Sequence, residues 1–188
     1  MEFLQRCDWC LGNPKMIHYH DTEWGVPLHD DGKLFEFMFL DTFQAGLSWS
    51  IILNKRENFK LEFDNFDFKK ISEYDDSKIT ELLTKPGIIR NKLKIKASIT
   101  NARAFMKIQE EFGSFDSYIW QFTERKVIKN EWYFIQQIPA RSEISDKMSK
   151  DLVKRGFMYA GSTICYAFMQ AIGMVNDHLA TCFRYHQV

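Results

Sequence analysis

One stretch of the chain, residues 34–53 (LFEFMFLDTFQAGLSWSIIL), constrains the fold more than any other. It consists mainly of Leu, Phe, Met and Ile and contains no basic residue, so we expect it to be buried. Asp41 lies among these apolar residues, and burying an unpaired charge costs several kcal/mol. Either Asp41 lies on the polar stripe of an amphipathic helix or caps a neighbouring helix, or it faces an aromatic-walled pocket.

The size and charge of the chain exclude several classes of protein. A length of 188 residues fits one domain or two intimate lobes, and 15% aromatic residues argue against disorder. Twenty-five basic and 25 acidic residues cancel, so no global positive field indicates nucleic acid, although a local patch can still bind it. We find no signal peptide and no uncharged span of membrane length, and we expect a soluble cytoplasmic protein.

Helix-capping residues, helix-terminating glycines and apolar periodicity predict a series of helices. No pattern of paired strands is found, so we expect an all-α globule. The expected helices are 30–46, 48–56, 68–74, 78–83, 90–112, 114–122, 145–155, 163–172 and 176–183. Residues 7–29 lack helical or alternating periodicity and are expected to form an ordered loop. A small hairpin is expected at 127–132.

Cysteine and histidine residues concentrate near the two ends of the chain. His178 and Cys182 are four residues apart, a spacing that places both on one face of a helix and suits two ligands of a tetrahedral ion. Taken alone, the spacing also fits a core histidine beside a buried thiol. The N-terminal segment offers Cys7, Cys10, His18 and His20 as further ligands, so a zinc ion would join the two ends. The residues alone do not choose between Cys7 with Cys10 and Cys7 with His20.

The segment 82–96 (LLTKPGIIRNKLKIK) predicts two helices joined by a tight Pro-Gly turn. Backbone N–H groups and the cations of Arg90, Lys92, Lys94 and Lys96 would gather at the start of the second helix, an arrangement that binds phosphate. The alternative is a solvated basic face after an ordinary turn. The local excess of positive charge in a neutral chain favours nucleic acid.

Four aromatic residues, Trp9, Tyr19, Trp24 and Trp49, are candidates to surround Asp41. Aromatic side chains usually belong to a core, but three of these four lie in the polar N-terminal segment. Aromatic faces combined with one carboxylate suit a flat ligand that is cationic or rich in hydrogen-bond donors.

Taken together, these residues resemble the bacterial 3-methyladenine DNA glycosylase I family, within the helix-hairpin-helix superfamily of base-excision enzymes. The motifs that carry the resemblance are CDW at 7–9, YHD at 19–21, EWGVP at 23–27, QAGLSW at 44–49, GIIR at 87–90, GSTICY at 161–166 and VNDH at 175–178. They are dispersed over nearly the whole chain and occur in the order of the family.

The resemblance implies a role for each group of residues. A structural zinc ion would be bound by Cys7, His20, His178 and Cys182, which favours His20 over Cys10. The extruded base would lie among Trp9, Tyr19 and Trp49, and the hairpin residues Gly87, Ile89, Arg90 and Lys94 would hold the DNA backbone. We expect a single unit of two lobes, a helical core at roughly 30–140 with the hairpin at 82–96, and a zinc-containing lobe from 1–29 and 141–188.

Two pocket residues depart from the family pattern. The family's glutamate, which contacts the modified adenine, falls at Asp41, and a family tyrosine falls at Met16. Alkylation at N3 makes adenine cationic and weakens its glycosidic bond, so Asp41 can act by stabilising positive charge. No carboxylate occurs in Thr100-Asn101-Ala102-Arg103, where related enzymes carry a catalytic aspartate, and no lysine nucleophile stands out.

We therefore expect a monofunctional hydrolase that releases 3-methyladenine from alkylated double-stranded DNA and leaves an abasic site. It would act as a monomer, without a membrane and without an obligate protein partner. The competing hypotheses are a catalytically weak or inactive lesion-binding protein and an enzyme with a shifted base preference.

Overall fold

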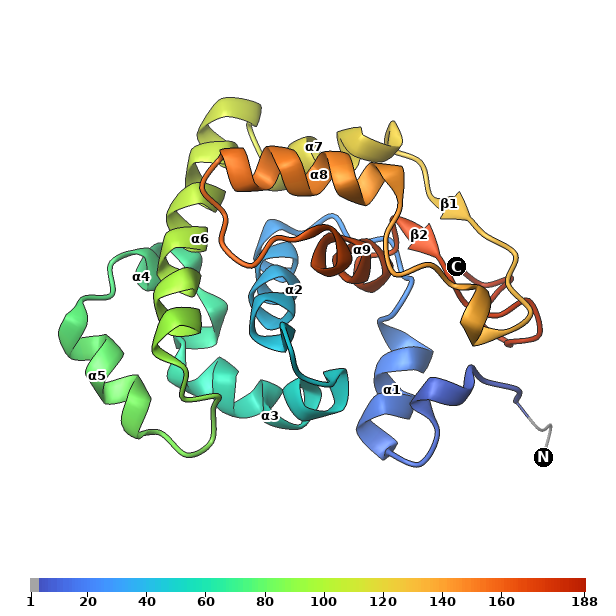
Figure 1. Ribbon diagram of the computed structural model, residues 1–188, viewed down its shortest axis with the longest axis horizontal. Helices are drawn as coiled ribbons and strands as arrows, with labels where there is room; N and C mark the ends of the chain where they lie inside the picture. The colour runs from blue at the N-terminus through green and yellow to red at the C-terminus, as the bar shows by residue number, and fades with distance from the viewer. Residues whose placement is uncertain (1–3) are drawn as a thin grey trace.

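The structure, a computed structural model, describes residues 4–188 and confirms a mainly helical fold (Figure 1). The α-helices are α1 (Pro14–Thr22), α2 (Asp31–Gln44), α3 (Trp49–Glu62), α4 (Phe68–Ser72), α5 (Asp76–Thr84), α6 (Lys92–Phe112), α7 (Phe115–Trp120), α8 (Glu143–Lys154) and α9 (Ser162–Ala171). Short 3-10 helices are η1 (Asp8–Cys10), η2 (Asp64–Phe66), η3 (Gln121–Thr123) and η4 (Ile135–Gln137). No helix in residues 4–188 has the length and apolar character that a membrane crossing requires.

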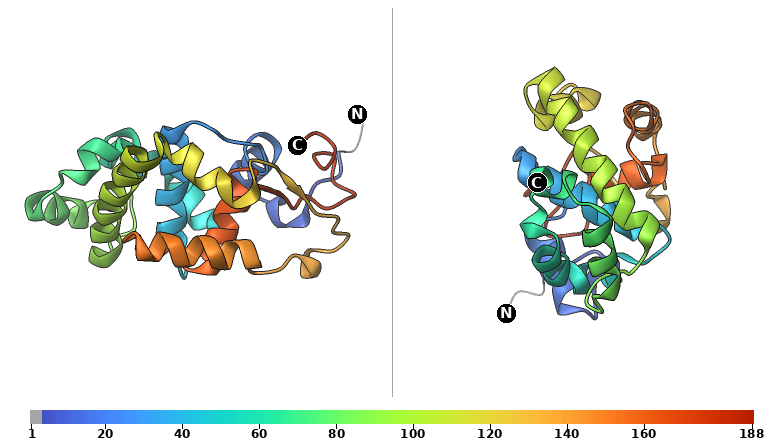
Figure 2. Two further views of the ribbon diagram at one scale, coloured as in Figure 1. Left: turned by 90° about the horizontal axis from the view of Figure 1, so that it is seen from above. Right: turned by 90° about the vertical axis from the view of Figure 1, so that its left-hand side faces the viewer.

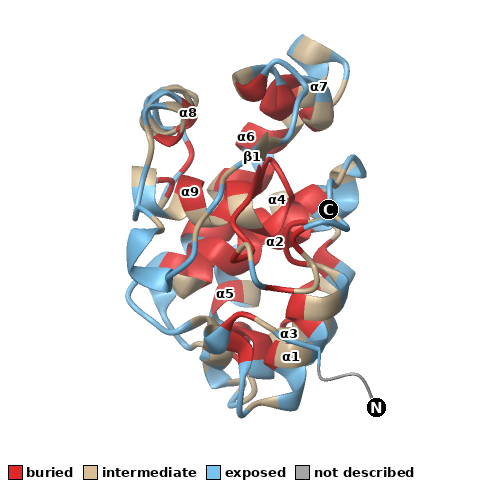
Figure 3. Ribbon diagram, turned by 90° about the vertical axis from the view of Figure 1, so that its right-hand side faces the viewer, coloured by how far each residue is buried: buried red, intermediate tan, exposed pale blue. Residues whose placement is uncertain are grey.

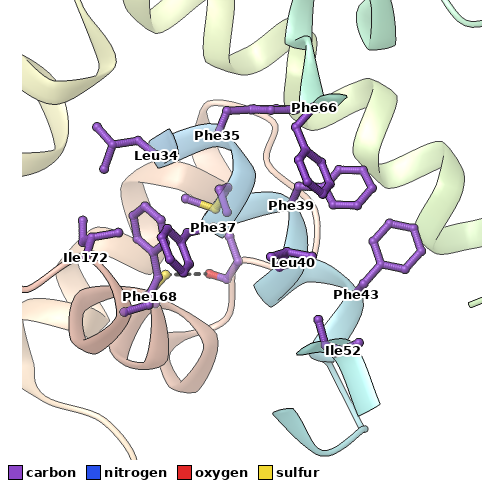
Figure 4. Packing of buried hydrophobic residues seen from close by; sticks show 14 of the residues in the cluster. Leu34, Phe35, Phe37, Phe39, Leu40, Phe43, Ile52, Phe66, Phe168 and Ile172 are labelled. Carbon is purple, nitrogen blue, oxygen red and sulfur yellow. Dashed lines mark hydrogen bonds between the residues drawn. The ribbon is translucent and has the colours of Figure 1, made fainter. Parts of the chain in front are cut away.

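Helix α2 is the centre of the fold. Asp30 caps it by accepting a hydrogen bond from the amide of Lys33 at 2.8 Å, and every residue from 34 to 43 is buried. One side of α2 packs phenylalanines against α3, while the other side meets Phe168 and Ile172 near α9 (Figure 4). Since each buried phenylalanine contributes about 1.5–3 kcal/mol, the apolar stretch fixes where α3, α6 and α9 can pack.

The helices α5 and α6 are joined by the predicted Pro-Gly turn. Asn91 caps α6, because its Oδ1 accepts hydrogen bonds from the amides of Leu93 and Lys94 at 3.0 and 3.2 Å. A Cβ atom at Gly87 would lie 2.9 Å from the side chain of Asn58 on α3. Glycine is therefore required here by packing of the turn against α3.

The sequence-based expectation for 127–132 was wrong. These residues form no hairpin; instead β1 (Ile128–Lys129) pairs in parallel with β2 (Val175–Asn176). The helix expected at 176–183 is also absent, because the chain leaves β2 in a series of turns. Both errors have one cause: the partner of each segment lies about fifty residues away, beyond the reach of local patterns.

The N-terminal segment is more regular than expected. Residues 14–22 form α1, which Asn13 caps and Pro14 begins. The chain after α1 then docks on the end of α9, where the amide of Gly25 donates to the carbonyl of Gln170 at 3.0 Å and that of Leu28 to Ile172 at 3.1 Å. The N-terminal and C-terminal segments consequently lie side by side (Figures 1 and 2). The division into two lobes stays a prediction.

Candidate active site and metal centre

A cavity of about 300 Å³ lies between α1, α2, α9 and the segment that follows β1. Its walls are mainly aromatic and aliphatic, with three polar side chains. The lining residues are Trp9, Tyr19, Trp24, Asp41, Gln44, Trp49, Ile135, Ile138, Ala167, Gln170 and Ala171. The structure thus brings Asp41 together with all four aromatic residues that the sequence singled out.

Asp41 is the buried carboxylate of this cavity, with only 2% of its surface exposed. Its Oδ2 atom has no hydrogen-bond partner among residues 4–188, and neither has the indole Nε1 of Trp49. Burial raises the pKa of Asp41 well above its ordinary value. Asp41 therefore lies in the wall of a pocket rather than on a polar stripe or at a helix cap, and its contact with a base stays a prediction.

The aromatic side chains make continuous contacts around the cavity. The rings of Tyr19 and Trp49 have centroids 5.2 Å apart, and those of Trp9 and Trp24 lie 5.0 Å apart in an edge-on arrangement. Burial, followed by the charge of Asp41, raises the pKa of Tyr19. The cavity therefore offers flat apolar faces, a buried hydroxyl, one unpaired acceptor and one unpaired donor, which suits a flat heterocycle.

The sequence missed part of this wall and assigned one residue to it incorrectly. Met16 is buried in α1 but does not line the cavity, so other side chains form the wall that it was expected to form. Ile135, Ile138 and Gln170 were not predicted, because they reach the pocket from the distant segment after β1 and from α9. A local sequence pattern gives no signal for such contacts.

Asp177 connects several elements behind the pocket. Its Oδ1 atom accepts hydrogen bonds from Asn130 and from the indole of Trp132, both at 2.8 Å. Its Oδ2 atom accepts hydrogen bonds from the hydroxyl of Tyr166 and from Gln170, again at 2.8 Å. With four donors this buried carboxylate is saturated, and it holds Gln170 in position at the pocket wall.

Four buried side chains, Cys7, His20, His178 and Cys182, form a separate cluster in which the possible ligand atoms all lie within 4.8 Å of one another. The Sγ of Cys182 is 3.4 Å from Nε2 of His20 and 3.7 Å from Nδ1 of His178, and the Sγ of Cys7 is 3.9 Å from the same Nδ1. The edges of a tetrahedron around zinc measure about 3.3–3.8 Å for such ligands. The cluster therefore fits a tetrahedral metal ion.

The surroundings of the cluster orient each ligand. Nδ1 of His20 pairs with Asp21 at 2.8 Å, and Nε2 of His178 lies 3.0 Å from the carbonyl of Trp24. The amide of Leu179 donates to Cys7 Sγ, and the hydrogen bond from Cys7, together with both histidines, lowers the pKa of Cys182. Such outer partners are typical of metal sites.

One alternative for the metal ligands is excluded, and one detail of the prediction changes. The Cys10 thiol lies outside the cluster and donates to the carbonyl of Cys7 at 3.1 Å, so the pair of Cys7 and Cys10 is not formed as a ligand pair. His178 and Cys182 converge from consecutive turns rather than from one face of a helix. The amide of His178 donates to the Asn176 side chain at 3.1 Å, which fixes the first of these turns.

The predicted phosphate-binding segment divides into exposed and buried cations. Arg90, Lys92 and Lys96 are exposed and form no ion pair in the described part of the chain. Lys94 is 5% exposed, and its ammonium donates to the carbonyls of Phe43 and Ala45 at 2.7 and 2.6 Å. The prediction that Lys94 binds DNA is therefore wrong, because its ammonium group is buried and donates hydrogen bonds to carbonyls at the C-terminal end of α2.

The described residues thus form a helical fold around a buried pocket with aromatic walls. A family model described as methyladenine glycosylase matches residues 9–185. DNA-3-methyladenine glycosylase 1 of Escherichia coli (strain K12) is 42% identical over 182 residues, which cover 97% of each chain. The DNA-3-methyladenine glycosylase of Haemophilus influenzae (strain ATCC 51907 / DSM 11121 / KW20 / Rd) is 41% identical over 177 residues, covering 94% of this chain and 96% of its own.

Solved structures agree with these sequence matches. A crystal structure of a 3-methyladenine DNA glycosylase I has a TM-score of 0.93 and 45% identity, covering 95% of this chain and 98% of its own. The structure of 3-methyladenine DNA glycosylase I from Staphylococcus aureus, which concerns 3-methyladenine recognition, has a TM-score of 0.92 and 29% identity and covers 96% of both chains. The chain belongs to the methyladenine glycosylase family.

Proposed function

We propose that this chain is a DNA base-excision repair glycosylase that extrudes 3-methyladenine from double-stranded DNA and hydrolyses its N-glycosidic bond. The observation that carries the proposal is Asp41, a buried carboxylate with an unpaired oxygen inside an aromatic-walled cavity. Its relatives named for 3-methyladenine support this choice of base.

The charge of the alkylated base explains how such a pocket selects and cleaves. In the free protein, burial favours the neutral form of Asp41. A cationic 3-methyladenine ring favours the carboxylate form instead, which can accept a hydrogen bond from the exocyclic amine while the aromatic rings stack on the base. Unmodified adenine lacks the charge, so it neither compensates the buried carboxylate nor carries a weakened glycosidic bond.

The composition of the pocket supports a monofunctional hydrolase. Among the described residues that line the cavity there is no lysine, the residue that would form a Schiff base with the sugar. We therefore propose that the product is an abasic site in an intact strand. A borohydride-trapped covalent adduct would contradict this part of the proposal.

For the DNA backbone, we propose the turn after α5 as a helix-hairpin-helix contact. The exposed cations of Arg90, Lys92 and Lys96 supply the charge, with Gly87 and Ile89 in the turn between the two helices. The amides of Leu93 and Lys94 at the start of α6 already donate hydrogen bonds to the side chain of Asn91. Phosphate contacts would therefore come from the backbone of the turn and from the side chains of the three exposed cations.

For the cluster of Cys7, His20, His178 and Cys182 we propose one structural Zn²⁺ ion. The two thiolates and two imidazoles are a donor set that zinc prefers, and three of their separations, 3.4, 3.7 and 3.9 Å, are close to the edges of a tetrahedron around zinc. A bound zinc ion would cross-link the N-terminal and C-terminal segments. None of the four residues lines the pocket itself, which supports a structural role, although Trp24 of the pocket wall packs against His178. We also propose that the protein works as a monomer without an obligate protein partner.

The test is the release of free base from methylated duplex DNA by wild-type protein and by Asp41→Asn. We expect wild type to release 3-methyladenine, Asp41→Asn to be at least tenfold slower, and Asp41→Glu to stay active. Wild-type activity in Asp41→Asn would remove Asp41 from the mechanism. If wild type releases no base yet binds abasic DNA, the chain is a lesion-binding protein, and release of a different alkylated base would show a shifted preference.

A further inference from the structure

Arg56 is a largely buried cation on α3, a helix that packs against both α1 and the more deeply buried α2 (Figure 3). Its Nε donates to Oε1 of Glu36 on α2 at 2.7 Å, and its Nη1 donates to Glu23, the residue after α1, at 2.8 Å. The side chains of Arg56 and Glu36 are only 12% and 7% exposed. Breaking so buried a pair is costly, because it leaves a charge without a partner.

On the side of α1, Arg56 holds residues that belong to the pocket wall. Glu23 directly precedes Trp24, and the backbone amides of both residues donate to the carbonyl of Tyr19 at 2.9 Å. Phe37 provides a second connection, since the guanidinium of Arg56 lies 5.4 Å from the centre of its ring. The same ring lies 6.2 Å from that of Tyr19. The cation is thus connected to two aromatic walls of the pocket.

The other two connections run along α2 and α3. Glu36 and Asp41 lie within two turns of each other on α2. Arg56 follows Trp49 by seven residues, or two turns of α3, so both side chains lie on the same side of that helix. The ion pair between Arg56 and Glu36 therefore fixes α3 against α2, and with it the position of Trp49 relative to Asp41.

Arg56 does not itself line the pocket. Together with Glu23 and Glu36 it lines a neighbouring cavity of about 690 Å³, and Tyr19 is a wall residue of both cavities. The cation therefore lies behind the aromatic wall. Its effect on the pocket passes through the residues that it holds or through its charge, and these two routes can be separated by experiment.

We propose that Arg56 is a positioning residue, which sets the spacing of the aromatic walls of the pocket by bridging Glu23 and Glu36. The inference rests on the proposed function as far as it concerns a base, whereas the bridge itself needs no ligand. A planar guanidinium donates in fixed directions to two carboxylates, which a flexible ammonium does not. A misplacement of about 1 Å around a reacting group can lower a rate about 100-fold, so the spacing of the walls matters.

The chain offers a matched control in Arg155. Its Nε donates to Asp151 on α8 at 2.6 Å and its Nη1 to Glu111 on α6 at 2.7 Å, while its guanidinium lies 4.9 Å from the centre of the Phe112 ring. Like Arg56, it bridges carboxylates from two elements beside an aromatic ring. Neither Arg155 nor its partners line the pocket.

The experiment compares wild type with Arg56→Met, Arg56→Lys, Glu23→Ala and Arg155→Met. The ligand-free measurement is fluorine NMR of protein labelled with 5-fluorotryptophan, because three of the five tryptophans lie in the pocket wall. Replacement of each tryptophan by phenylalanine assigns the signals. Titration with free 3-methyladenine and single-turnover base release from methylated duplex DNA complete the set.

We expect Arg56→Met to shift or broaden the three pocket signals and to leave those of Trp120 and Trp132 in place. It should bind 3-methyladenine about tenfold more weakly and release base at least tenfold more slowly. Arg56→Lys keeps the charge without the bridge and should resemble Arg56→Met. Glu23→Ala removes the connection to α1 alone and should change the Trp24 signal most. Arg155→Met should keep the pocket signals, the affinity and the rate of wild type.

The outcomes separate this role from the proposed function. Unchanged pocket signals in Arg56→Met overturn the proposal, whether or not wild type excises base, and Glu23→Ala decides in the same way if Arg56→Met does not fold. Wild-type signals and affinity in Arg56→Lys would show that charge suffices, and equal changes in Arg155→Met would show a general loss of stability. Either result overturns the proposal. If the pocket signals move in Arg56→Met but wild type releases no 3-methyladenine, the proposed activity fails while the positioning role stands.

Discussion

The cysteine–histidine cluster and the pocket around Asp41 are both made of buried polar groups among aromatic rings, but they differ in hydrogen bonding. In the cluster, each histidine has a partner for its outer nitrogen, and both sulfur atoms receive a backbone amide. In the pocket, Asp41 Oδ2 and Trp49 Nε1 have no partner in the part of the chain that the structure describes.

This difference indicates what each region is for. A buried polar group that finds its partners within the protein contributes to stability, whereas one left unpaired costs free energy. The cost is recovered when a ligand supplies the missing partner. The cluster is thus arranged to hold the fold, and the pocket is arranged to gain from binding.

The largest effect should follow removal of a metal ligand. Cys7→Ser or His178→Ala is expected to lower the free energy of unfolding by about 4 kcal/mol or more, because the proposed ion would join the N-terminal and C-terminal segments. Denaturant unfolding together with the zinc content of purified protein measures this. Cys10→Ser, a change of a buried thiol outside the cluster, should keep the zinc. Full stability of a zinc-free protein would contradict the structural role.

In the pocket, by contrast, a substitution is expected to raise the free energy of unfolding. Because the pKa of Asp41 is raised in the folded state, the folded protein keeps a proton that the unfolded chain releases, and its stability falls as pH rises above about 3.9. Asp41→Asn should therefore be more stable than wild type. The difference in free energy of unfolding between the two proteins should not vary at low pH. Above about pH 3.9 it should grow in favour of Asp41→Asn by up to about 1.4 kcal/mol per pH unit, until the pH reaches the pKa of Asp41 in the folded protein. Thermal unfolding of both proteins between pH 3 and 8 tests this, and a pH-independent gap would refute it.

Two indoles give a matched comparison of a paired and an unpaired donor. Trp132→Phe removes a hydrogen bond to buried Asp177 and should lower the free energy of unfolding by about 1–3 kcal/mol. Trp49→Phe removes a donor without a partner, so stability should change little while affinity for 3-methyladenine falls several-fold. Chemical denaturation and titration with the free base measure the two quantities. Equal losses of stability would show that the two donors do not differ.

The smallest effect is expected outside both regions. Arg90→Gln should leave the unfolding curve unchanged and reduce the slope of log K against log salt concentration for duplex binding by about 0.9. Lys107→Gln, an exposed change further along α6, serves as the control and should leave the slope as in wild type. An unchanged slope for Arg90→Gln would remove this side chain from the DNA contact.

Most helices could be predicted because their signals are local. Asp30 and Asn91 cap α2 and α6, and the apolar stretch after Asp30 marks the buried helix. Helix α1 was missed because its histidines and aromatics mask the periodicity, although Asn13 followed by Pro14 is a helix-start signal that could have found it.

The parts that could not be predicted depend on distant segments. The pairing of Ile128 with Val175 and the closeness of Ile135 to the pocket join residues far apart in the chain. Lys94 was misassigned because a basic pattern does not reveal that one ammonium reaches the open carbonyls at the end of α2. For Asp41 the residues alone left alternatives open and the family resemblance indicated a pocket residue, but its burial without a partner for Oδ2 could be seen only in the fold.

The proposed metal site also has a consequence for biosynthesis. Cys182 follows His20 by 162 residues, so the first two ligands leave the ribosome long before the last two exist. The cluster can close only after translation has passed Cys182. A prematurely terminated chain would expose Cys7 and His20 without their partners, and it would lack the link that holds the N-terminal segment. A chain that ends before Cys182 thus lacks the four-residue ligand set that the proposed zinc ion would need.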